Sequence, residues 1–134
     1  FTKLPEQMET SEPFDVGPVR VIPQDRVWTS FIGDPGGQQK LAFAPKGVRF
    51  DLPTAVDEVT VTVNNYAGRV LNFTVLVGET AVQQLPVLVF NEMKTVTLAQ
   101  PGLTGFIVTG GDNESSVVEI CFCQPVNGEP PAVD

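Results

Sequence analysis

Hydrophobic and polar side chains alternate along most of the chain with a period of two residues. The clearest stretch is 58–64, where Val59, Val61 and Val63 alternate with threonines. A period of two predicts a β-strand with one buried face. Similar short runs, including 48–52, 70–77, 94–98 and 104–109, bring the prediction to about nine strands and no helix.

Glycine and proline, twelve of each, divide these runs and predict the turns. The segment 64–69 predicts a hairpin loop that pairs the strand 58–64 with the strand 70–77, because its asparagines and glycine tolerate positive φ. Pro101 and Gly102 predict a turn between two further strands. Pro86 interrupts an apolar stretch and places it at a sheet edge or across a bend, because proline cannot donate to a strand ladder.

Many short strands separated by turns predict an all-β, antiparallel two-sheet sandwich, and a jelly-roll-like arrangement is the first choice. An immunoglobulin-like sandwich is the alternative, although its Cys…Trp…Cys spacing is absent. Residues 1–17 are acidic and polar and predict an irregular arm. Residues 18–123 form the predicted sandwich domain, and residues 124–134 form a proline-rich tail.

The charge and composition narrow the class of function. The formal net charge is −8, and the eight basic residues are scattered, so nucleic acid is not an expected partner. The chain has no histidine, which removes Ser-His-Asp catalysis and most zinc sites. No apolar run reaches roughly 18 residues, so no membrane-spanning helix is expected. We therefore predict a protein that is not an enzyme.

Three stretches together carry a resemblance to a known kind of domain. They are GVRFDLP at 47–53, VTVTVNNYAG at 59–68 and GFIVTGGDNESSVVEICF at 105–122. They resemble a family of bacterial secreted β-sandwich domains that are similar to carbohydrate-binding modules and galactose-binding-like domains. The positions that match the family's final strand pair are Val108, Gly110, Gly111, Asn113, Glu114, Glu119, Ile120 and Cys121. The resemblance implies an extracellular, non-catalytic accessory module.

One candidate ligand-binding group lies at the end of the strand 58–64 and in the loop that follows it. It consists of Asn64, Asn65, Tyr66 and Arg69. Sugar-binding faces stack rings on tyrosine or tryptophan, and the asparagines and the arginine supply a polar rim. The alternative interpretation is that Tyr66 only packs the end of the hairpin.

A candidate calcium site comprises Asp112, Asn113, Glu114 and Glu119. These side chains carry oxygen donors, and calcium takes six to eight such ligands. Similar jelly-roll modules often hold a structural calcium near the first and last strands, so calcium is the one cofactor considered. The alternative is that the Asp-Asn pair simply makes a turn.

Cys121 and Cys123 flank Phe122 and therefore point to the same face of the last predicted strand. Alternate Cα atoms in a strand lie about 6.5–7 Å apart, which would strain a disulfide bond between them. Three alternatives stay open: two buried thiols, a strained bridge, or pairing with another chain.

Two functions from different classes remain. The first is a non-catalytic extracellular module that binds a glycan or a surface polymer in an adhesion or accessory role. The second is a structural subunit that assembles with copies of itself into an extracellular fibre or sheath. Assembly would use the terminal arm and the strand edges, which offer unpaired N–H and C=O groups.

Overall fold

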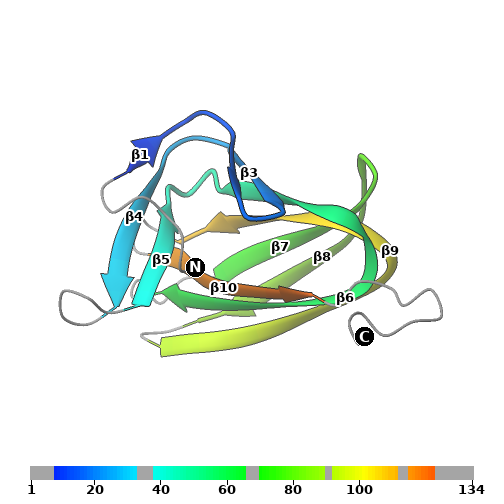
Figure 1. Cartoon of the computed structure of the whole chain (residues 1–134). Helices are drawn as coiled ribbons and strands as arrows, with labels where there is room; N and C mark the ends of the chain where they lie inside the picture. Colours follow the sequence, from blue (N-terminus) through cyan, green and yellow to red (C-terminus); the bar gives the residue numbers. More distant parts are fainter. Residues whose placement is uncertain (1–7, 33–37, 66–69, 90–91, 112–114, 123–134) are drawn as a thin grey trace.

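The computed structural model describes residues 8–32, 38–65, 70–89, 92–111 and 115–122. In this part of the chain every regular element is a β-strand, all pairings are antiparallel, and there is no helix, so the predicted all-β class is confirmed (Figure 1). The strands are β1 (Glu9–Thr10), β2 (Phe14–Val16), β3 (Val19–Pro23), β4 (Val27–Ile32), β5 (Gln38–Phe43), β6 (Val48–Asn65), β7 (Val70–Val77), β8 (Thr80–Leu88), β9 (Glu92–Gly110) and β10 (Ser115–Phe122).

Two long strands, β6 and β9, run through both layers of the sandwich. Their pairing continues from Val48↔Val108 to Asn65↔Glu92, with register shifts between Asp51 and Glu58. Such bulges let a strand bend without leaving the sheet. Figure 1 shows both strands curving at the right of the view and returning along the other layer.

The bend divides the strands into two layers. The first layer has the order β1-β4-β5-β10-β6-β9 and uses the last part of β6 and the first part of β9. The second layer has the order β2-β3-β6-β9-β7-β8 and uses the remaining parts of the two long strands. This arrangement is consistent with the predicted jelly-roll-like sandwich.

The core lies between the layers and follows the period of two. Val59, Val61 and Val63 are at most 1% exposed, as the alternation predicts. Phe50 and Phe106 face each other across β6 and β9, with ring centroids 5.1 Å apart, and both rings are fully buried. The largest fully buried side chains also include Phe43, Phe73, Leu41, Leu71, Leu98 and Leu103.

Three sequence predictions about strand boundaries are corrected by the structure. The runs 48–52 and 58–64 belong to one strand, and so do 94–98 and 104–109. Pro101 and Gly102 lie within β9 and make no chain reversal. Gly102 has a φ of 78° at the bend, a conformation that glycine adopts without steric cost. The described residues hold ten strands, against about nine predicted.

The predicted hairpin between 58–64 and 70–77 is also wrong. β6 pairs with β10 on one side and with β9 on the other, whereas β7 pairs with β8 and β9. Both sides of β6 are occupied, so the chain crosses to the other layer after Asn65. Pro86 lies in β8, the outermost strand of the second layer, so its prediction as an edge residue is confirmed.

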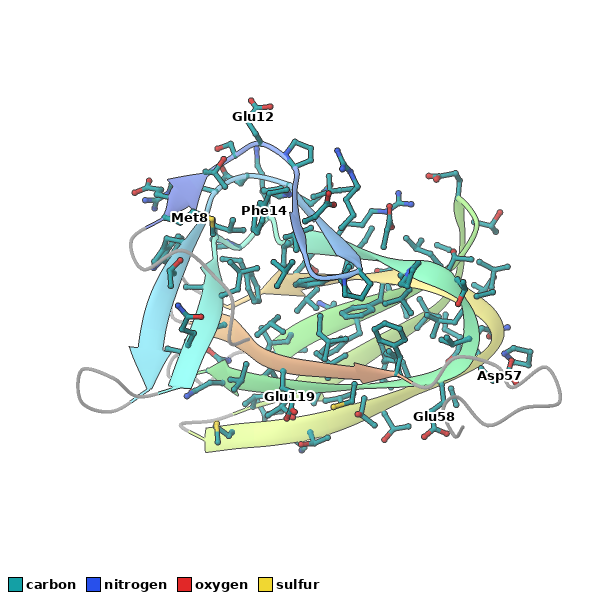
Figure 2. The ribbon with its side chains drawn as sticks, in the orientation of Figure 1. Met8, Glu12, Phe14, Asp57, Glu58 and Glu119 are labelled. Atoms are coloured by element: carbon teal, nitrogen blue, oxygen red, sulfur yellow. The ribbon has the colours of Figure 1, made fainter. Side chains whose placement is uncertain are left out.

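Part of the segment 1–17, predicted to be an irregular arm, forms strands. β1 pairs with β4 and β2 pairs with β3. Met8 and Phe14 pack against the core from this side, whereas Glu12 is exposed (Figure 2).

Candidate functional site

The described residues that flank three connections lie together at one end of the sandwich. The connections join β6 to β7, β8 to β9, and β9 to β10. In the first layer, Asn65 is the Cα partner of both Ser115 and Glu92. In the second layer, Leu71 is the partner of both Gly110 and Val87. The matched registers bring the starts and ends of the three connections together, and we call this region the loop end.

Asn65 ties the three connections to one another. Its side chain is fully buried. Its Nδ2 donates to the carbonyl oxygen of Val89 at 3.0 Å, and its Oδ1 accepts a hydrogen bond from Ser115 Oγ at 2.9 Å. One amide therefore holds the flanks of all three connections, and this satisfies polar groups that would be costly to bury without partners.

Two glycines shape the connection between β9 and β10. Gly110 and Gly111 have φ values of 105° and 75°, a region that side chains rarely adopt. A Cβ on Gly110 would lie 2.6 Å from the carbonyl oxygen of Val70, and a Cβ on Gly111 would collide with Ser115 Oγ. Glycine is therefore required at position 110 by the close approach of β9 to β7, and at position 111 by the close approach of Gly111 to Ser115 in β10.

The predicted ligand-binding residues lie partly inside the fold and partly outside the described residues. Asn64 is 4% exposed and Asn65 is fully buried, so neither side chain lies on the surface of this structure. Tyr66 and Arg69 lie outside the described residues. Asn65 occupies the next inward position after Val63, and the period of two was the signal that could have revealed its structural role.

Only one of the four predicted metal ligands, Glu119, lies within the described residues. Asp112, Asn113 and Glu114 lie outside the described residues. Glu119 lies four positions after Ser115 in β10, roughly 10–13 Å along a strand. It is exposed on the outer face of the first layer, at the register of Thr62 (Figure 2). Within the described ranges, no group of three or more His, Cys, Asp or Glu side chains lies close enough to hold a metal ion.

Cys121 is exposed in β10 opposite Thr60, and its Sγ donates to Glu119 Oε2 at 3.5 Å. The period of two had placed this side chain on the face opposite Ile120, and Ile120 packs against the core. Cys123 lies outside the described residues. The alternative of two buried thiols is wrong for Cys121, which is exposed, whereas a strained bridge and pairing with another chain stay as predictions.

The described tryptophan is partly buried and lies under a cation. The Arg26 guanidinium lies 4.7 Å from the centroid of the Trp28 ring and forms an ion pair with Glu9 at 2.9 Å. Arginine over an indole face is a favourable cation–π arrangement. Because Arg26 covers the ring, Trp28 does not offer that face to a sugar in this structure.

An ion-pair network ties the turn between β7 and β8 to the outer face of the second layer. Arg49 donates from Nε to Asp51 at 2.7 Å and from both terminal nitrogens to Glu79 at 3.0 and 3.1 Å. The hydrogen bonds and the charge of Arg49 lower the pKa of Glu79. The two carboxylates in turn raise the pKa of Arg49, which stays protonated.

Comparisons with known proteins add little to these observations. No protein-family model matches the chain. No curated protein matches it either. Among solved structures, the chain is similar to a family 6 carbohydrate-binding module, with 13% sequence identity and a TM-score of 0.46 over 90% of this chain and 94% of that chain. A likeness of this degree carries no argument about function.

Proposed function

We propose that this domain is a non-catalytic extracellular module that binds a glycan or another surface polymer through the loop end. The observation that carries the proposal is the Asn65 junction, which fixes the flanks of three neighbouring connections on a rigid sandwich. Binding residues are found disproportionately on loops that a rigid scaffold positions.

The residue types in these connections support a ligand rich in hydroxyl groups. The connection after Asn65 contains Tyr66 and Arg69, and the connection after Gly111 contains Asp112 and Glu114. The described flanks of the two connections are neighbours, since Asn65 pairs with Ser115 and Leu71 pairs with Gly110. An aromatic ring can stack on the apolar face of a sugar, while guanidinium and carboxylate groups exchange hydrogen bonds with its hydroxyls.

Calcium is part of this proposal, and Asp112, Asn113 and Glu114 are its proposed ligands. Carboxylate and amide oxygens are its usual protein ligands. Glu119 is a less suitable ligand for the same ion, because it lies farther along β10 than the loop end.

Screening the protein on a glycan array with calcium, and again with a chelator, tests the proposal. We expect selective binding to one class of polysaccharide that Tyr66→Ala and Arg69→Ala abolish. Thr97→Ala is the matched control, because Thr97 is exposed on β9 away from the loop end. Binding that is unchanged in both loop variants would place the site elsewhere.

A further inference from the structure

Exposed apolar side chains occur on β8 and on the strands next to it in the chain. In the described part of the chain, five large apolar side chains are at least 37% exposed: Val70, Val82, Leu85, Leu88 and Met93. All of them lie on β8 or at the starts of the strands next to it in the chain, and Leu88 is the Cα partner of Val70. Val70 and Leu88 form an exposed apolar pair across β7 and β8, and exposed apolar patches are typical of interaction surfaces.

β8 presents an open strand edge beside these side chains. Among the described strands only β7 pairs with it, so its other edge has no strand partner. Eight of its nine residues are exposed, and Val87 alone is partly buried. An exposed edge of this length is a template for pairing with another strand.

The charge pattern favours an uncharged partner strand. Thr80–Leu88 contains no charged residue, although the chain carries a net charge of −8. The other outermost strands carry charges, namely Glu9 on β1, Asp15 on β2 and Lys94 on β9. An uncharged edge fits an uncharged strand, since burying an unpaired charge against it would be costly. β8 itself has the required composition.

We propose that β8 pairs antiparallel with β8 of a second copy, so that the second layers of the two molecules form one continuous sheet. Antiparallel pairing gives a closed two-fold dimer, in which the same surface of each molecule forms the interface. With Gln84 opposite its counterpart, Val82 lies opposite Pro86 of the partner copy.

Pro86 and the register shift near Val82 weaken this dimer. Proline in an edge strand turns its nitrogen to the solvent side, so each Pro86 leaves one carbonyl of the facing strand without a donor. The bulge between Val75 and Leu76 in the β7–β8 ladder also twists the edge. Association is therefore concentration-dependent. It strengthens with salt, because two molecules of charge −8 repel each other.

Sedimentation velocity of the full chain in reductant, over roughly 10 μM to 1 mM where weak interfaces associate, tests the proposal. Wild type should dimerise in this range. Gln84→Lys should be monomeric, because two lysines would face each other at the two-fold axis. Pro86→Val should dimerise at least threefold more tightly, and the control Thr97→Lys should match wild type.

Far-ultraviolet circular dichroism and thermal unfolding of every variant separate loss of pairing from loss of folding. A wild type and a Pro86→Val variant that both stay monomeric at 1 mM would overturn the proposal and leave the β8 edge to a strand of another sequence. A dimer, or any larger particle, that persists in a folded Gln84→Lys variant would also overturn it.

Discussion

Ser115 Oγ donates to Asn65 Oδ1 at 2.9 Å, and the two residues are Cα partners at the ends of β10 and β6. Fifty positions separate them in the chain. The bond therefore closes the first layer at the loop end, and the other half of the same amide holds Val89. Substitutions at Asn65 and Ser115 can therefore remove these hydrogen bonds together or one at a time.

Removing the Asn65 amide should destabilise the fold strongly. Asn65→Ala leaves the Val89 carbonyl and the Ser115 hydroxyl buried without this partner, and we expect a loss of about 2–4 kcal/mol in the free energy of unfolding. Ser115→Ala removes one of the two bonds and should cost about 1 kcal/mol. Urea denaturation measures both values, with the exposed Asn72→Ala as a control that changes stability by less than about 0.5 kcal/mol. Equal losses of unfolding free energy in Asn65→Ala and Asn72→Ala would show that the Asn65 hydrogen bonds do not stabilise the fold.

Glycine at position 110 is required for a steric reason beyond its φ angle. Gly110 and Gly78 both have positive φ, but a Cβ on Gly78 meets nothing within 4 Å. Gly78→Ala should therefore cost about 1 kcal/mol from backbone strain alone. Gly110→Ala should cost about 3 kcal/mol, because its Cβ would also collide with the Val70 carbonyl. Similar melting temperatures for the two variants would show that β7 and β9 are not in such close contact.

The Arg49–Glu79 pair should contribute stability at neutral pH and lose it in acid. Arg49 lowers the pKa of Glu79, so the folded state favours the charged carboxylate. That stability is fully present above the ordinary Glu pKa of 4.5 and is lost as the pH falls through the lower value of the folded state. Wild type should therefore melt at a higher temperature than Glu79→Gln at pH 7, and the difference should shrink as the pH falls below 4.5.

The Arg49→Gln variant tests whether Arg49 is the partner of Glu79. In Arg49→Gln protein, Glu79→Gln should have little effect at pH 7 or below pH 4.5. A melting difference between wild type and Glu79→Gln that does not depend on pH would contradict the ion pair.

The stacked phenylalanines of the two long strands should be among the most sensitive core positions. Phe106 is fully buried against Phe50. Phe106→Ala should cost about 3–5 kcal/mol, and Phe106→Leu should cost less than half of that, because it leaves a smaller cavity. Urea denaturation of both variants checks the order, and equal losses would show that the cavity does not set the cost.

Local alternation was enough to predict which side chains enter the core. Val59, Val61 and Val63 were expected to face inward and are buried, because burial on one face of a strand imposes a period of two. Alternation cannot choose strand partners. The hairpin expected at 64–69 failed because β9 and β10, both distant in sequence, occupy the two sides of β6.

Glycine and proline signals were similarly ambiguous about strand ends. Pro101 and Gly102 have the composition of a turn, yet β9 continues through them, because its partner β6 bends at the matching positions. The role of Asn65 was missed for a related reason. An asparagine before a loop is typical of an exposed turn, and only the distant Ser115 and Val89 make its burial favourable.

Calorimetric titration of the glycan selected on the array tests the ligand site at the loop end. It should use Gln84→Lys protein, so that pairing of β8 does not enter the result, and the same protein carrying Tyr66→Ala or Arg69→Ala. We predict one binding site per chain and an affinity at least tenfold weaker in each loop variant, a loss of about 1.4 kcal/mol or more. Binding of equal strength in folded loop variants, or the absence of any selected glycan, would contradict a ligand site at the loop end.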